Sequence, residues 1–276
     1  MSERDESPTP PTTRSTSSAS AIDPDLPGEV VEAVRRAEWI TVFTGAGMSA
    51  ESGIATFRDA ETGLWQEFDP AQLATPEAWA ADPALVWGWY QWRARMIRDA
   101  QPNAGHRALV ELARDRAVMV VTQNVDDLHE RAGSDVVSHL HGSLFAPRCS
   151  HCGRPYHGTG ADPELAVHEV RVEPPTCPVC LSAIRPGVVW FGEPLPTDAW
   201  KTAENVFAAS DVVLVVGTSG IVYPAAELPE RAIVAGTPVI EFNPEPSALS
   251  REVTHSIRTS AAIGLPALVT AVRPTD

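Results

Sequence analysis

Basic residues are scarce in this sequence. It contains one lysine, Lys201, and its 36 acidic residues outnumber the 21 Lys and Arg, which gives a formal net charge of −15. This balance argues against direct binding of nucleic acid and favours basic polypeptides as partners. Long apolar runs are also missing, so the sequence predicts no membrane-spanning helix and no secretory signal. We therefore expect a cytoplasmic protein with no membrane partner.

The length and composition predict one folded domain that carries an insertion. A chain of 276 residues, 43% of them hydrophobic, can bury a substantial core. Residues 1–27, however, are rich in Ser, Thr and Pro and contain almost nothing apolar. Such a segment cannot offset its loss of conformational entropy by burial, so we expect a disordered tail.

Short apolar runs mark the expected strands of a sheet. They lie at residues 39–43, 117–121, 212–216 and 238–242. Continuous apolar strands are typical of parallel sheets whose two faces are covered by helices, and helical spacing at 106–114 and 223–234 supplies such helices. The sequence thus predicts an α/β fold. Each run ends in small or polar residues, and these ends converge on one ligand-binding crevice in such a sheet.

Two stretches do not fit the sheet, and we expect them to form a smaller domain over the crevice. Residues 59–105 are rich in Trp and helical in pattern, and residues 148–185 hold the cysteines among Pro and Gly. The sheet domain would then consist of residues 28–58, 106–147 and 186–276.

The four cysteines form two Cys-x-x-Cys pairs, Cys149 with Cys152 and Cys177 with Cys180. In a chain without a secretion signal, two such pairs indicate a zinc site before they indicate disulfides. Four thiolates close a tetrahedral shell and leave no position for water, so the site would be structural. His151 or His157 could replace one cysteine as a ligand, and four unrelated buried cysteines are the remaining alternative.

A glycine-rich motif follows the first expected strand. Residues 45–50 read Gly-Ala-Gly-Met-Ser-Ala and match the GxGxxG/A pattern. Glycine allows a tight turn and close approach to a pyrophosphate, which then sits at a helix amino terminus. The acidic residue that usually ends a second strand about 20 residues later is missing, which argues against an ordinary dehydrogenase.

Longer strings carry a resemblance to one family. Residues 45–54 (GAGMSAESGI) and 56–58 (TFR) resemble the cofactor loop of the sirtuins, which are NAD-dependent protein lysine deacylases. The segments at 122–129 (TQNVDDLH), 132–133 and 140–143 (LHGS) are similar to catalytic strings of that family, and 189–193 (VWFGE), 217–219 and 242–243 to its later motifs. The resemblance covers roughly residues 28–270. It implies a Rossmann-like NAD-binding domain beside a helical and zinc-ribbon domain.

The resemblance also implies a role for individual residues. The cofactor site would include Gly45, Ala46, Gly47, Ser49, Ala50, Glu51, Ser52, Phe57, Arg58, Trp65, Gln123, Asn124, Val125, Asp126, Gly217, Thr218, Ser219, Asn243 and Ala261. The backbone near Val189, Phe191, Gly192 and Glu193 would bind an extended substrate peptide by strand addition, although the same segment also reads as a plain buried strand. The family usually has proline where this chain has Ala55, and we expect a looser loop there.

His141 is the expected general base, with Asn124 and Asp126 as its catalytic partners. Imidazole titrates near neutrality and can accept a proton from a ribose hydroxyl. His139 lies two positions away and would share its face on a strand, and only the likeness of Leu-His-Gly-Ser to the family string favours His141. His106 would support a helix start capped by Asn103.

Tyr90 and Arg93 lie three apart in a helical pattern and so would project from one face. This Tyr-x-x-Arg spacing resembles the pair found in the sirtuin branch that removes succinyl, malonyl and glutaryl groups. A guanidinium can bind the terminal carboxylate of such a group in bidentate fashion. The alternative is that Tyr90 belongs to the Trp-rich core while Arg93 is solvated.

The resemblance implies an enzyme that consumes NAD. The acyl oxygen of a lysine would displace nicotinamide, and the acyl group would leave as O-acyl-ADP-ribose, with succinyl and malonyl favoured and acetyl also removed. A plain deacetylase, transfer of ADP-ribose to protein, and a non-catalytic NAD-sensing scaffold remain as alternatives. The sequence does not determine the target proteins or the oligomeric state, and a monomer is one option.

Overall fold

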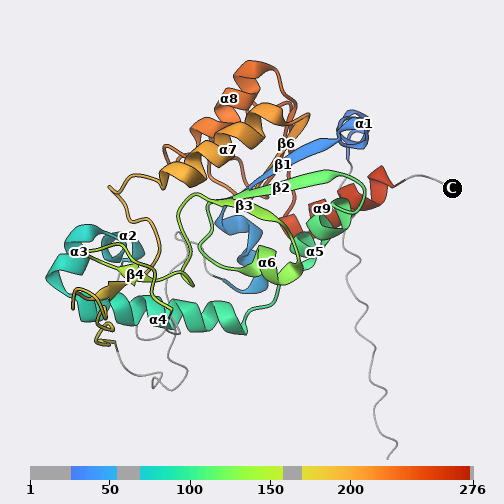
Figure 1. The fold of residues 1–276 in the computed structure, drawn as a ribbon. Coiled ribbons are helices and arrows are strands. Elements are labelled where there is room, and N and C mark those ends of the chain that lie inside the picture. Colours follow the sequence, from blue (N-terminus) through green and yellow to red (C-terminus); the bar gives the residue numbers. More distant parts are fainter. Residues whose placement is uncertain (1–25, 55–68, 158–169, 274–276) are drawn as a thin grey trace, which may run out of the picture.

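Six parallel strands form the central sheet of the computed structural model, which describes residues 26–54, 69–157 and 170–273 (Figure 1). The strands are β1 (Trp39–Thr44), β2 (Ala117–Thr122), β3 (Val136–His139), β6 (Val212–Val216), β7 (Val239–Phe242) and β8 (His255–Ile257). Their order is β3-β2-β1-β6-β7-β8, so the direction of progress reverses between β1 and β6. Open sheets with this order bind ligands beside the reversal, at the carboxyl ends of the strands.

The four strands expected from apolar runs are present, with bounds that differ by no more than one residue. The sequence did not indicate β3 and β8, the two edge strands, which have four and three residues. Both are short, and each pairs on one side only. Less burial on the free side allows polar residues such as His139, His255 and Ser256, which removes the apolar signal.

Helices cover both faces of the sheet, and the predicted α/β fold is therefore confirmed. On one face lie α1 (Gly28–Arg36), α5 (Ala104–Leu112) and α9 (Ala261–Val272). On the other lie α7 (Thr197–Ala209) and α8 (Glu227–Ala235) (Figure 1). Helix α8 starts four residues later than its apolar spacing suggested. Helix α5 starts at the expected cap, because the Asn103 side chain accepts from the Gly105 amide at 2.8 Å.

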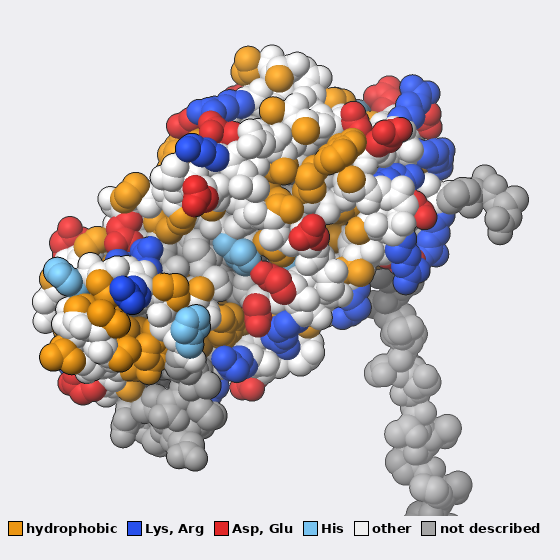
Figure 2. Space-filling model, viewed as in Figure 1, with side chains coloured by type: hydrophobic (Ala, Val, Ile, Leu, Met, Phe, Trp, Pro, Cys, Tyr) orange, Lys and Arg blue, Asp and Glu red, His pale blue; other side chains and the backbone are white. Residues whose placement is uncertain are grey.

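A smaller domain lies beside the sheet. Its helices are α2 (Pro70–Leu73), α3 (Pro76–Ala81) and α4 (Pro83–Asp99), and its two-stranded antiparallel sheet pairs β4 (Arg148–Cys149) with β5 (Ile184–Arg185). Its core also takes in Leu144, Val188 and Trp190, from segments expected to belong to the sheet domain. In Figure 2, exposed hydrophobic side chains gather on this smaller domain. Within the described part of the chain, no helix is long and apolar enough to cross a membrane.

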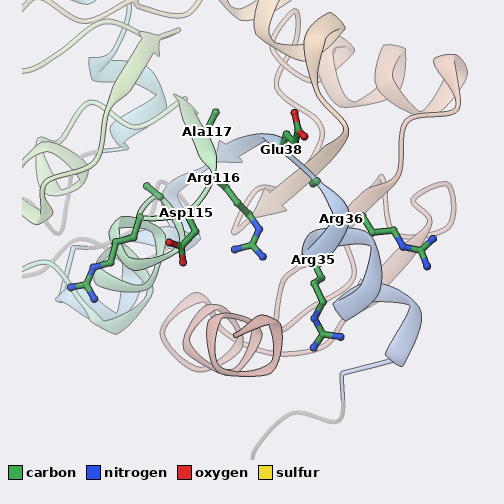
Figure 3. Close-up of a pocket in the computed structure, with 9 residues that line it drawn as sticks. Arg35, Arg36, Glu38, Asp115, Arg116 and Ala117 are labelled. Carbon is green, nitrogen blue, oxygen red and sulfur yellow. The ribbon is translucent and has the colours of Figure 1, made fainter. Parts of the chain in front are cut away.

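A polar hollow of about 700 Å³ lies at the opposite end of the sheet, beside the start of β1 and β2 (Figure 3). Arg35 and Arg36, at the end of α1, line it together with Arg116. Arg35 donates to the carbonyl of Ala271, and Arg36 pairs with Glu32. Arg35 thus links the ends of α1 and α9. The hollow lies at the amino ends of the strands, which is not where an open sheet binds its ligand.

Two backbone segments meet at the carboxyl end of the sheet reversal. The amide of Gly45 donates to the carbonyl of Val216 at 3.0 Å, and that of Gly47 donates to the carbonyl of Gly217 at 2.8 Å. Gly217 adopts a left-handed conformation with φ of +61°, and a Cβ at this position would lie 2.4 Å from the Met48 amide nitrogen. Only glycine fits there, because a side chain would be strained and would also push the two loops apart.

We predict that Gly217→Ala lowers the free energy of unfolding by about 2–4 kcal/mol, from backbone strain together with overpacking. Gly236→Ala is the matched control: Gly236 has φ of +80° but open space around its Cβ position. Strain alone should cost about 1 kcal/mol there. Urea unfolding of both variants measures the difference, and equal losses would mean that the close approach at Gly217 contributes nothing.

Candidate active site

The segment after β1 forms two short 3₁₀ helices, η1 (Ala46–Met48) and η2 (Ala50–Ser52). The helix start expected after the glycine motif is therefore a short 3₁₀ turn rather than an α-helix within residues 45–54, and binding of a pyrophosphate there stays a prediction. The loop is held in place by hydrogen bonds from Asn103, the residue that caps α5. The Asn103 side chain donates to the Met48 carbonyl at 2.8 Å and to Ser52 Oγ at 3.2 Å.

Polar groups at the ends of four neighbouring strands contact one another, as the predicted crevice requires. Gln123, after β2, donates to Thr218 Oγ1 at 3.0 Å, and Asn243, after β7, donates to the Thr218 carbonyl at 2.8 Å. Glu51, which the resemblance places in the cofactor site, also makes a structural contact. Its carboxylate accepts hydrogen bonds from Ser260 Oγ and from the Ala262 amide, both at 2.8 Å. These contacts tie the cofactor loop to the start of α9, where Ala261 is buried.

Asn124 and Asp126 converge on one hydroxyl. Ser49 donates to Asp126 Oδ2 at 2.9 Å and accepts from Asn124 Nδ2 at 3.2 Å. All three side chains are buried. Burial raises the pKa of Asp126, and hydrogen bonds from the Leu128 amide and from Ser49 offset part of that rise. Val125, between the two, turns into the core of the smaller domain instead.

Below Asn124 lies a buried layer of hydroxyl and imidazole groups, whose members had no individual role predicted from the sequence. Thr44 and Thr122 end the paired strands β1 and β2, and their hydroxyls lie 2.8 Å apart. Thr122 accepts from the Asn124 amide at 3.0 Å, and His129 Nε2 lies 3.1 Å from Thr44 Oγ1. Burial lowers the pKa of His129 well below its usual value, and that of His106 beside it to about 4. The signal available in the sequence was the threonine that directly follows each of the apolar runs 39–43 and 117–121.

His141 lies in the turn that follows β3, at the edge of the crevice. Its carbonyl accepts from the Val189 amide at 2.8 Å, and the next residue, Gly142, bridges to Val188. Burial lowers the pKa of its imidazole, and a hydrogen bond with the Gln123 backbone offsets part of the effect. The imidazole is therefore neutral at neutral pH, as a proton acceptor must be.

His139 has a different environment. It ends β3, so the expectation that it shares a strand face with His141 is wrong. Its Nε2 lies 2.6 Å from Glu130 Oε1. Burial alone would lower the pKa of His139, but the hydrogen bond and charge of Glu130 raise it above the ordinary value. Its Nδ1 lies 3.4 Å from the Asn124 carbonyl, so both ring nitrogens of His139 have partners within the protein, which favours His141 as the base.

Tyr90 and Arg93 lie on α4 in the core of the smaller domain. Their exposed fractions are 3% and 8%, so the interpretation of Arg93 as a solvated arginine is wrong. The Arg93 guanidinium lies 5.1 Å from the centre of the Trp89 ring. Tyr90 packs in the same hydrophobic cluster as Ile54 of the cofactor loop and Val125 of the catalytic segment. This face of α4 therefore lies beside the expected nicotinamide site.

Residues 189–193 form a turn rather than the buried strand that was one interpretation. The Phe191 amide donates to the carbonyl of Ala74 at 2.9 Å, and the Phe191 side chain is half exposed. Glu193 forms a bidentate pair with Arg185, at 2.6 and 2.9 Å. The Glu193 carboxylate therefore stabilises the turn. Gly192, within the turn, adopts a left-handed backbone conformation. Binding of a peptide by strand addition stays a prediction.

The four cysteines form one cluster in which all Sγ atoms lie within 4.8 Å of one another. Cys149 and Cys180 are separated by 3.3 Å between sulfurs, and Cys152 and Cys177 by 3.8 Å. A tetrahedron with Zn–S bonds of 2.3 Å has edges of about 3.8 Å, so the cluster fits zinc. Within the described part of the chain, neither His151 nor His157 joins it. The alternatives with a histidine ligand or with unrelated cysteines are not supported.

We predict that Cys152→Ser releases the zinc and lowers the thermal unfolding temperature, because a structural site of this kind contributes on the order of 10 kcal/mol of binding free energy to folding. His151→Ala, one residue away and exposed, is the control and should keep one zinc per chain. Metal content of the purified variants measures the outcome. Loss of zinc from the histidine variant would contradict the four-cysteine assignment.

Some expected site residues lie outside the described residues. These are Phe57, Arg58 and Trp65 of the cofactor segment, together with Ala55 and most of the predicted tail.

Comparisons with known proteins agree with this arrangement. Residues 45–224 match the profile of the Sir2 family. The chain is 54% identical over 230 residues to a Mycobacterium tuberculosis protein named NAD-dependent protein deacylase, covering 83% of this chain and 96% of that protein. A solved Sir2 homolog–NAD complex has a TM-score of 0.81 at 42% identity, over 88% of this chain and 93% of that one. A Sir2 structure bound to a propionylated peptide has a TM-score of 0.71 at 26% identity, over 86% and 94%.

The family profile spans more than half of the chain, and the relative is matched over nearly its whole length. The crevice at the sheet reversal and the four-cysteine cluster agree with the two groups that the sequence predicted, NAD and zinc. The chain therefore belongs to the Sir2 family, as an NAD-dependent enzyme that uses NAD as co-substrate and carries a structural zinc ion.

Proposed function

We propose that this protein is an NAD-dependent protein-lysine deacylase that prefers succinyl and malonyl groups and retains some deacetylation. The name of the M. tuberculosis relative supports the deacylase activity. The acyl preference depends on one observation, the burial of Tyr90 and Arg93 together on the face of α4 beside the catalytic segment.

The chemistry of that face suits an acidic acyl group. An acetyl group needs only an apolar tunnel, whereas a terminal carboxylate loses its hydration on entry and must gain a charged partner. The Arg93 guanidinium is buried and lies over the Trp89 ring, and burial of this kind leaves the attraction between a guanidinium and an anion weakly screened. A guanidinium also matches a carboxylate with two parallel hydrogen bonds.

Other residues of the crevice bind NAD and accept a proton during the reaction. NAD, when bound, supplies a ribose whose bond to nicotinamide can be exchanged for a bond to the acyl oxygen. The neutral imidazole of His141 accepts the proton of a ribose hydroxyl. Asn124 and Asp126, held by Ser49, line the ribose and nicotinamide end of the crevice.

We predict that Arg93→Met lowers kcat/KM for a succinyl-lysine peptide by roughly 100-fold, since a charge-assisted bidentate pair is lost. Deacetylation of the matched acetyl peptide should change little. Arg98→Met is the control, because Arg98 lies on the same helix but is exposed. Mass spectrometry of both peptides, with and without NAD, measures the rates. Equal losses for both peptides in the Arg93 variant would refute the acyl preference.

The pH dependence should identify the base. Burial disfavours the imidazolium of His141, so its folded pKa lies below the ordinary value of about 6.5, and the neutral form persists above that pKa. Activity should therefore fall only as the pH drops through a value below about 6.5. If His139 were the base, its raised pKa would make activity fall at a pH above about 6.5 instead.

The matched variants are His141→Asn and His139→Asn. We expect the first to abolish turnover with the fold intact, and the second to retain most of it. Transfer of label from NAD to protein in place of deacylation would instead support an ADP-ribosyltransferase, and NAD binding without nicotinamide release would support a sensor.

A further inference from the structure

Trp190 contacts the Tyr90 hydroxyl in a way that fixes what this hydroxyl can do. The indole Nε1 of Trp190 lies 3.1 Å from the Tyr90 oxygen, and both side chains are buried. An indole N–H is a donor only, so the Tyr90 oxygen must be the acceptor of this bond. The two residues lie 100 positions apart in the sequence and meet in the core of the smaller domain.

The proton of the Tyr90 hydroxyl is then left to donate elsewhere. Among the described residues, none accepts it. Burial raises the pKa of Tyr90 far above its usual value, so the hydroxyl keeps its proton at neutral pH. A buried donor without an acceptor is unfavourable, and a ligand oxygen that accepted this proton would relieve the penalty.

The ring of Trp190 is held in place by a braced turn. The Arg185 guanidinium lies 3.3 Å from the centre of the ring, and Glu193 accepts from the Trp190 amide at 2.9 Å while it pairs with Arg185. Trp79 packs nearby, with ring centres 5.7 Å apart. The indole N–H therefore has little freedom to turn away from Tyr90.

We propose that Trp190 is a positioning residue for acyl selectivity: by occupying the acceptor side of the Tyr90 hydroxyl, it leaves that hydroxyl as a donor to a carboxylate oxygen at the end of the acyl chain. This inference rests on the proposed acyl preference. The donated bond also polarises the phenol and makes its O–H a stronger donor. Arg93 supplies the charge, and Trp190 acts only through Tyr90.

The first test is Trp190→Phe, which keeps an aromatic ring and removes the N–H. We expect the ratio of kcat/KM for succinyl peptide to that for acetyl peptide to fall roughly tenfold, mainly through the KM for the succinyl peptide. Trp200→Phe is the control, because Trp200 lies on α7 and packs against the core of the sheet domain, in a different hydrophobic cluster from Trp190 and Tyr90. Its ratio should stay at the wild-type value.

A second variant separates the loss of the hydrogen bond from the loss of packing that Trp190→Phe also causes. Replacing Trp190 with β-(3-benzothienyl)alanine keeps the bicyclic shape and puts sulfur in place of the N–H. The ratio should fall as it does for Trp190→Phe. An unchanged ratio in this variant would overturn the inference, since only the hydrogen bond is missing.

The decisive measurement is the effect of the same change in a Tyr90→Phe background. If Trp190 acts through the Tyr90 hydroxyl, removing its N–H there should cause no further loss of the ratio. An additional loss would mean that Trp190 acts by packing. If Tyr90→Phe and Arg93→Met leave the ratio unchanged, the acyl preference itself fails, and the role of Trp190 fails with it. If they change the ratio while the Trp190 variants do not, only the role of Trp190 is overturned.

Discussion

The active site depends on the close contact between the backbone after β1 and the backbone after β6. These strands are neighbours at the sheet reversal, and their loops meet at Gly47 and Gly217 with a hydrogen bond of 2.8 Å and no room for a Cβ. Because the loops touch here, the polar ends of β2 and β7 also reach Thr218, through Gln123 and Asn243. One steric constraint thus gathers groups from four strands into a single crevice.

Electrostatic differences between similar residues support the different roles that we propose for them. His139 and His141 are two positions apart, but a carboxylate raises the pKa of the first and burial lowers that of the second. The same contrast separates Arg93, buried among aromatic rings, from the exposed Arg98 on the same helix. Burial and partners, rather than residue type, decide which group can accept a proton and which can attract a desolvated anion.

The smaller domain connects the cysteine cluster to the proposed acyl site through a short chain of contacts. Cys149 lies on β4, and its partner strand β5 ends in Arg185, which pairs with Glu193 and stacks on Trp190. Trp190 in turn contacts Tyr90. A zinc ion held by the four cysteines would therefore stabilise the strand pair that carries Arg185, the residue stacked on Trp190.

The sequence by itself determined the α/β fold, the four buried strands, the cysteine ligands and the family, because these depend on local periodicity, spacing and ordered strings. Only the tertiary structure showed the edge strands β3 and β8, the burial of Arg93, the pairing of Glu193 with Arg185 and the contact between Trp190 and Tyr90. The physical reason is that a side chain's burial and hydrogen-bond partners are set by packing between distant segments, here up to 100 residues apart, and leave no pattern in the local sequence.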